Sequence, residues 1–220
     1  IRATRIICAL ELIRQKTPAL GKEPITIGMW VGGASSPNHY KVAKEAVDEA
    51  MHKEDPVPHS LVLKECPWCN TPFKAADNYV ATEQSFHFQC TNTSCEYGHP
   101  NADPLPCNVV DEALYESPPT FLIATIDKFA RFAWDERSSS FFGVKGNLPP
   151  ELIIQDELHL ISGALGSVAG LYEAALDVVI QGRDIQPKYV ASTATIRMAQ
   201  EQTKNLYGRD VAVFPPPGIS

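Results

Sequence analysis

The sequence lacks any apolar run approaching the roughly 20 residues that a membrane-spanning helix needs. Its N-terminus, Ile1-Arg2-Ala3-Thr4-Arg5, also lacks the charged, then apolar, then small-residue order of a secretory signal peptide. We therefore expect a cytoplasmic protein without a membrane partner. No internal repeat and no low-complexity tract is present, and nothing in the composition suggests disorder.

Positive charge is also scarce. The 220 residues carry 19 lysines and arginines against 26 acidic residues, a formal net charge of −7. This balance argues against a compact, non-specific nucleic-acid binder, which would carry a basic face. It does not exclude a protein whose nucleic acid runs in a track between domains. The length suits one full-sized domain and a small inserted one.

Short apolar runs alternate with stretches of helical periodicity along most of the chain. Strands are predicted at 24–31, 120–124, 151–155 and 188–192, and helices at 4–16, 38–53, 126–134, 165–181 and 196–207. This alternation is typical of an α/β fold, a parallel sheet with helices on both faces. Ligands of such sheets bind beyond the carboxyl ends of the strands.

The pattern is interrupted at 56–108, where paired cysteines, prolines and aromatic residues replace any long period. We expect a small inserted module there. Residues 1–55 and 109–214 would then form the two parts of the larger domain, and the proline-rich 215–220 would be an exit linker.

Two adjacent acids follow the apolar run Leu152-Ile153-Ile154-Gln155, in the order Asp156-Glu157-Leu158-His159. This is the layout of a Walker B element, in which one carboxylate holds magnesium, usually through water, and a second orients or deprotonates the attacking water. Asp156 would take the first role and Glu157 the second, with His159 close enough to report nucleotide state. The competing interpretation is a helix N-terminus, where acids are favoured by the macrodipole.

Three small hydroxyl residues, Ser192, Thr193 and Thr195, follow the next predicted strand, with Ala194 between the two threonines. They could bridge the acidic pair to a neighbouring domain, or merely cap a helix. At this point the sequence resembles superfamily 2 helicases of the D-E-x-H type. Residues 156–159 match motif II of that family, and Thr193-Ala194-Thr195 match motif III, on successive predicted strands. The resemblance implies a RecA-like motor domain that uses ATP and Mg²⁺.

Three longer segments resemble the DrmA-type helicases of bacterial DISARM anti-phage systems, and the match extends over most of the chain. They are 27–33, 118–129 and 151–163. The resemblance implies that Gly32, Gly33, Thr125 and Lys128 contact a nucleic-acid backbone, DNA rather than RNA, and that partner subunits of a defence complex exist. Without it, Gly32-Gly33 would be a turn and Lys128 a solvated surface charge.

The phosphate-binding loop that such a motor needs is missing, because Gly21-Lys22 is followed by Glu23 and not by a hydroxyl residue. This chain by itself is not expected to hydrolyse ATP. The simplest explanation is a fragment, with the phosphate loop upstream of Ile1 and a second motor domain downstream of Ser220. The other is a degenerate, non-hydrolysing relative.

Cys66-Pro67-Trp68-Cys69 and Cys90 with Cys95 form two close pairs, which suits a closed tetrahedral zinc site. Four thiolates leave no position for water, so the Zn²⁺ would be structural. His87 or His99 could replace one cysteine, whereas Cys8 and Cys107 are expected to be buried thiols.

Between Leu61 and Cys107 the inserted module has two lysines and no arginine against five acids, which disfavours phosphate binding. We expect a structural or protein-contacting module. Two other functions stay open. The protein could be a zinc-ribbon module, binding nucleic acid or protein, on a non-catalytic α/β scaffold. A metal-dependent nuclease would need a third converging acid, and none is evident.

Overall fold

The computed structural model describes residues 1–53, 57–129, 134–161, 163–182, 185–193, 203–204, 207–208 and 212–214. Its contacts fall into two compact units, Ile1–Arg137 and Ser138–Ser220, each with its own parallel strands. None of the helices in the described part of the chain combines the length and the apolar composition of a membrane span. The expected α/β class is confirmed, whereas the helix predicted at 196–207 lies almost wholly outside the described residues.

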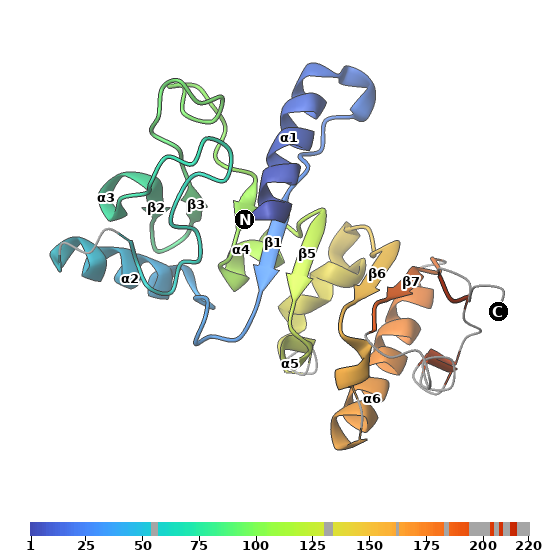
Figure 1. Ribbon diagram of the computed structural model, residues 1–220. Helices are drawn as coiled ribbons and strands as arrows, with labels where there is room; N and C mark the ends of the chain where they lie inside the picture. The colour runs from blue at the N-terminus through green and yellow to red at the C-terminus, as the bar shows by residue number, and fades with distance from the viewer. Residues whose placement is uncertain are drawn as a thin grey trace, which may run out of the picture. The chain divides into compact units, whose positions relative to one another are not determined.

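The first unit is built on a three-stranded parallel sheet in the order β4-β1-β5 (Figure 1). The central strand β1 (Ile27–Trp30) pairs with β4 (Cys107–Asn108) on one side and with β5 (Phe121–Ala124) on the other. Both β1 and β5 lie within the predicted strands. The sequence did not predict β4, because two residues are too few to show a period.

One face of β1 is covered by α4 (Asp111–Glu116). Trp30 Nε1 donates a hydrogen bond to the Tyr115 hydroxyl at 3.1 Å. Gly28 lies on the same face as Trp30, and a Cβ there would come within 2.5 Å of Leu114 Cδ2. Glycine is therefore needed at this position for the helix to approach the strand.

The opposite face of β1 meets a second helix. Met29 packs against the core cluster that contains Cys8 of α1 (Arg2–Lys16). Glu11 of α1, which is buried, accepts a hydrogen bond from the Ile25 N–H at 2.8 Å. This bond joins the helix to the segment that leads into the strand.

The inserted module shares its core with the helices around it. It contains α3 (Ala75–Asn78) and an antiparallel hairpin of β2 (Tyr79–Ala81) and β3 (Phe86–Phe88), and α2 (Tyr40–His52) belongs to the same cluster. The buried aromatic and aliphatic side chains of this shared core include Phe73, Tyr79, Phe86, Phe88, Ala43 and Val47. The module is therefore not an independent body in packing terms.

The second unit pairs β6 (Leu152–Gln155) with β7 (Lys188–Ala191) in parallel, connected by the long helix α6 (Gly163–Gln181). All three elements were predicted. The remaining short elements are α5 (Ile126–Phe129) and the 3-10 helices η1 (Pro18–Leu20), η3 (Glu136–Phe142), η4 (Val144–Gly146) and η5 (Leu158–Leu160).

Replacing Gly28 with alanine is expected to lower the free energy of unfolding by about 1–3 kcal/mol, because the added methyl overpacks the strand against Leu114 and Pro119. Denaturant titration measures the change. Gly32→Ala is the matched control, since nothing lies within 4 Å of a Cβ at that position. Equal losses in the two variants would contradict this account of the packing.

Candidate functional site

The predicted acidic pair lies at the carboxyl end of β6, beside the end of β7. The Ser192 hydroxyl donates a hydrogen bond to Asp156 Oδ1, which also accepts the Glu157 N–H at 3.0 Å. These two hydrogen bonds lower the pKa of Asp156, and the bond from Ser192 has the larger effect. The carboxylate therefore stays ionised at neutral pH, as a magnesium-holding group must.

Parallel strand pairing brings these two segments together. Gln155 is in register with Ala191, the last residue of β7. The Ser192 N–H then donates to the Gln155 carbonyl, and the Leu158 N–H donates to the Ser192 carbonyl, both at 2.9 Å. The segment after β6 is thus tied to the segment after β7 by backbone and side chain together.

Ser192 belongs to the run that was expected to bridge the acidic pair, but only Thr193, Ala194 and Thr195 were assigned a role at the site. The run of small hydroxyl residues that it begins was the available signal, but nothing in that run distinguishes Ser192 from Thr193. Thr193 follows Ser192 in the chain and is half-buried. Ala194 and Thr195 lie outside the described residues, so their coupling role stays a prediction.

Glu157 has a left-handed backbone, with φ of 53°. A non-glycine residue in this region costs on the order of 1 kcal/mol, and such strain is often found at functional sites. Its side chain is 57% exposed, and one carboxylate oxygen lies 3.2 Å from His159 Nδ1. The fold therefore brings Asp156, Glu157 and His159 together, with both carboxylates open to solvent.

The predicted nucleic-acid contacts belong to the first unit, where two loops leave the carboxyl ends of neighbouring strands. Gly32 and Gly33 follow β1, and Thr125 follows β5; all three are exposed. The Thr125 N–H donates to the Trp30 carbonyl at 3.3 Å, so the two loops begin side by side. All three are uncharged residues at the edge where parallel sheets bind ligands.

Lys128 does not fit its predicted role as a phosphate contact. Its side chain is only 2% exposed. The ammonium donates to Asp111 Oδ2 at 2.6 Å and to Asn38 Oδ1 at 3.0 Å. The charge is therefore satisfied inside the protein, and Lys128 is neither a phosphate contact nor a solvated surface charge in this structure.

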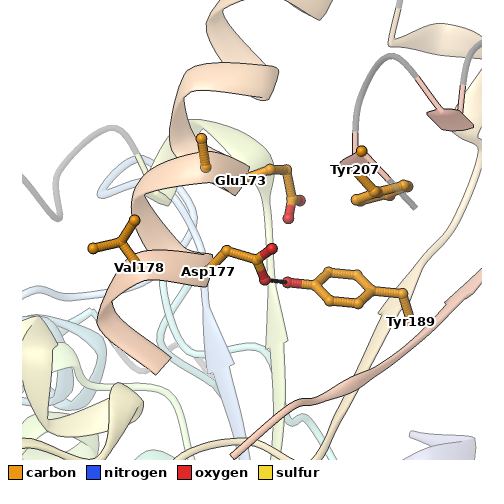
Figure 2. Close-up of a pocket in the computed structure, with 7 residues that line it drawn as sticks. Glu173, Asp177, Val178, Tyr189 and Tyr207 are labelled. Carbon is orange, nitrogen blue, oxygen red and sulfur yellow. Dashed lines mark hydrogen bonds between the residues drawn. The ribbon is translucent and has the colours of Figure 1, made fainter. Parts of the chain in front are cut away.

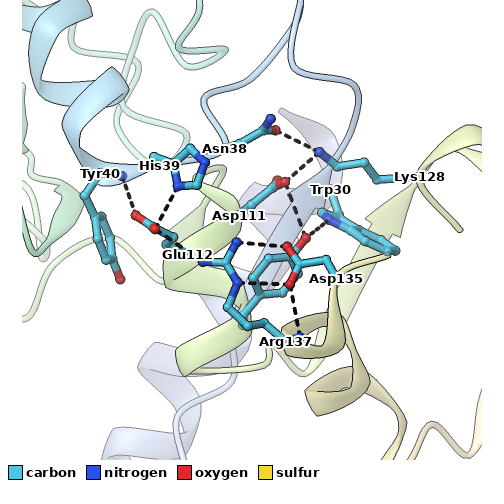
Figure 3. A network of polar contacts seen from close by, with 10 residues as sticks. Trp30, Asn38, His39, Tyr40, Asp111, Glu112, Lys128, Asp135 and Arg137 are labelled. Atoms are coloured by element: carbon cyan, nitrogen blue, oxygen red, sulfur yellow. Dashed lines mark hydrogen bonds and ion pairs between the residues drawn. The ribbon is translucent and has the colours of Figure 1, made fainter. Parts of the chain in front are cut away.

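Figure 3 shows the polar contacts around this lysine. Next to Asp111 on α4, Glu112 receives the Tyr40 N–H at 2.8 Å and contacts His39 and Arg137 at 2.8 and 3.3 Å. Burial raises the pKa of Glu112, but the bonds from His39 and Tyr40 outweigh it, so the pKa is lowered. The first turn of α4 therefore carries two acids in ionic contacts that sequence reasoning missed, because their partners are distant in the chain.

Four cysteine sulfurs, those of Cys66, Cys69, Cys90 and Cys95, lie within 4.8 Å of one another. The Sγ atoms of Cys69 and Cys90 are 3.7 Å apart. A tetrahedral site with Zn–S bonds near 2.3 Å places its sulfurs roughly 3.8 Å apart. The residues present therefore fit a zinc ion.

The turns around these cysteines have the tight geometry of metal-binding knuckles. The Asn70 N–H donates to the Cys66 carbonyl at 2.9 Å, and Asn70 itself has φ of 60°. In the second pair, a Cβ on Gly98 would lie 2.0 Å from the Asn92 carbonyl oxygen, so only glycine fits. Among the described residues, the four-sulfur group includes neither of the competing histidines, His87 and His99, nor the other two cysteines, Cys8 and Cys107.

A pocket of about 360 Å³ lies in the second unit between α6, β7 and Tyr207 (Figure 2). Asp177 accepts a hydrogen bond from the Tyr189 hydroxyl at 2.8 Å. Burial, and then the neighbouring charge of Asp177, raise the pKa of Glu173 to about 7. The pocket thus holds a carboxyl group that titrates near neutrality.

No protein-family model matches the chain. Over an alignment of 269 residues, covering 99% of this chain, it is 34% identical to the DISARM protein DrmA of Bacillus paralicheniformis (strain ATCC 9945a / NCIMB 11709 / CD-2). The alignment covers 23% of that relative, so the chain spans about a quarter of its length. The chain is DrmA-like over nearly its whole length, which confirms the resemblance found in its motifs.

Two crystal structures of the DUF1998 helicase MrfA also align with the chain. The DNA-bound one has a TM-score of 0.40 at 14% identity and covers 91% of this chain and 20% of that one. The other has a TM-score of 0.39 at 13% identity, covering 93% and 31%. TM-scores below 0.5 do not establish a shared fold.

Purified under reducing conditions, the protein is expected to bind one zinc ion at the four cysteines, and Cys90→Ser is expected to lose it and to unfold at a lower temperature. Elemental analysis and thermal unfolding with and without a chelator measure both effects. Cys107→Ser is the matched control, because Cys107 lies outside the sulfur group. Full zinc content in the Cys90 variant would contradict the site.

The stability of Glu173→Gln relative to wild type is expected to be about 2 kcal/mol greater at pH 8 than at pH 5. The wild-type carboxyl, whose folded pKa is raised, contributes stability at low pH that is lost as the pH rises through about 7. The glutamine cannot ionise, so its advantage grows as the pH rises from about 4.5 to about 7. Thermal unfolding at both pH values measures it, with exposed Glu151→Gln as the control. A pH-independent difference would contradict the shifted pKa.

Proposed function

We propose that this chain is part of the motor of an ATP-dependent helicase or translocase of the DISARM type, acting on DNA in anti-phage defence. The observation that carries the proposal is the hydrogen-bonded junction of Asp156 and Ser192 at the ends of two parallel strands. An ordinary helix N-terminus would explain the two acids, but it would not explain a hydrogen bond from the end of a second strand. The similarity to DrmA supports the same function.

Within this function Asp156 holds Mg²⁺ through water, and Glu157 orients or deprotonates the water that attacks the γ-phosphate. When bound, Mg²⁺ would neutralise the charge that develops on the phosphates. The lowered pKa keeps Asp156 ionised for this purpose. His159, within reach of Glu157, passes the state of the site to its surroundings.

The segment from Ser192 to Thr195 couples hydrolysis to movement. A change in the hydrogen bond that Asp156 accepts would be felt at Ser192 and, through Thr193, Ala194 and Thr195, by a neighbouring domain. Gly32, Gly33 and Thr125 follow a DNA strand by uncharged contacts to its phosphates, without reading its sequence.

The remaining parts support the motor. Residues 1–55 and 109–214 form a RecA-like domain, 56–108 a zinc-stabilised insertion, and 215–220 a linker. The phosphate loop and a second motor domain would be supplied by the rest of a longer protein, together with partner subunits of a defence complex. A cytoplasmic setting suits four cysteines that stay reduced.

DNA-stimulated ATP hydrolysis by the natural full-length protein tests this function. Glu157→Gln keeps the side-chain shape but removes the base, so the rate is expected to fall by about 10²–10⁴-fold while nucleotide still binds. Glu151→Gln, exposed at the start of the same segment, is the matched control and should retain activity.

Two results would overturn the proposal. One is a wild-type protein that hydrolyses no ATP with DNA or RNA; the other is a Glu157 variant as active as wild type. Either would favour the alternative, a zinc-ribbon binding module on a non-catalytic scaffold, for which the four-sulfur group is the supporting observation.

A further inference from the structure

A buried ion pair sits beneath the two strand-end loops. The side chains of Lys128 and Asp111 are 2% and 3% exposed, and their charged atoms are 2.6 Å apart. Removing two charges from water costs several kcal/mol, and a well-packed apolar pair of the same volume is often as stable or more so. Stability alone therefore gives little reason for an ion pair here. What the pair does provide is a fixed arrangement of the segments that carry it, because its hydrogen bonds require a defined geometry.

The pair joins three segments that are far apart in the chain. Lys128 lies on α5, directly after the β5 loop, and donates to Asn38, which ends the β1 loop. Asp111 begins α4 and also accepts a hydrogen bond from the Tyr115 hydroxyl at 3.5 Å. Tyr115 in turn receives Trp30 Nε1, so the end of β1 is tied to the same group.

Two further hydrogen bonds fasten the β1 loop to the first residue of α4 and to the segment before it. The Asp111 N–H donates to the Pro37 carbonyl at 3.2 Å, and the Ser36 hydroxyl donates to the Val109 carbonyl. Near the other end of the loop, a Cβ on Gly33 would lie 3.2 Å from Asn38 Nδ2. The Asn38 side chain therefore lies directly against the exposed glycine, and a shift in one would displace the other.

We propose that Asn38, Asp111 and Lys128, the Lys128 network, are positioning residues that hold the two exposed loops at the spacing a single nucleic-acid strand requires. The inference rests on the proposed function, since it assigns a role at the same strand-binding edge. The network touches no nucleic acid itself. It acts through Gly32, Gly33 and Thr125, whose uncharged contacts depend on placement more than on charge.

The test uses the full-length protein and a fluorescent oligothymidylate as the probe, with the dissociation constant and the DNA concentration for half-maximal ATPase stimulation as readouts. The double variant Lys128→Met, Asp111→Asn removes both charges together, so neither is left buried and alone. We expect both readouts to rise about tenfold, since small misplacements of binding groups have effects of this size or larger. The melting temperature should stay within a few degrees of wild type.

Lys41→Met, an exposed lysine on α2, is the matched control and should bind as wild type does. Asn38→Leu breaks only the contact to the β1 loop and leaves the ion pair intact. It should weaken binding in the same direction, and it replaces the double variant as the test if that variant fails to fold.

The outcomes separate the two proposals. If wild type binds DNA and a folded network variant binds equally well, the positioning role is wrong and the motor assignment stands. If wild type does not bind DNA and hydrolyses no ATP with DNA or RNA, both are wrong. If the loss of DNA binding is proportional to the decrease in melting temperature across all variants, the role of these residues is purely structural and the inference is wrong.

Discussion

Parallel pairing between neighbouring strands is the constraint on which the candidate site depends. Because paired strands run in the same direction, the segments that follow them leave the sheet at one edge. The register of β6 with β7 places Ser192 against Asp156, and that of β1 with β5 places Thr125 beside Trp30. A slip of one residue would turn each of these side chains to the other face. The chemistry at both edges therefore follows from backbone register first and from residue identity second.

The charged groups of the chain are handled in two different ways. Asp156 and Glu157 are exposed, where ionisation costs little and where a hydrated cation can approach. Lys128 and Asp111 are buried, and they contact each other together with Asn38 and the Tyr115 hydroxyl. The exposed acids suit a site that binds and releases a ligand, whereas the buried pair suits a geometry that must not change. The net charge of −7 does not distinguish the exposed charges from the buried ones, since it sums them all.

The inserted module shows how a small segment without a core of its own can still be ordered. Its aromatic side chains join the cluster that α2 and the first helix already form, and the Tyr97 hydroxyl donates to the Cys8 carbonyl at 2.7 Å. Four cysteines placed on two tight turns would add a metal-bound cross-link to this packing. The module and the sheet are therefore coupled through α1, which contacts both.

The sequence by itself determined the local features: the α/β alternation, the apolar strands, the acidic pair after β6 and the set of four cysteines. Each of these is written in neighbouring residues, as a period, a run or a spacing. The tertiary structure alone decided that Lys128 is buried, that Asp111 and Asn38 hold it, and that Ser192 is the hydroxyl that reaches Asp156. These partners lie 17, 90 and 36 residues apart. No local pattern encodes such contacts, because a lysine or serine reads the same whether packing leaves it exposed or brings a distant partner to it.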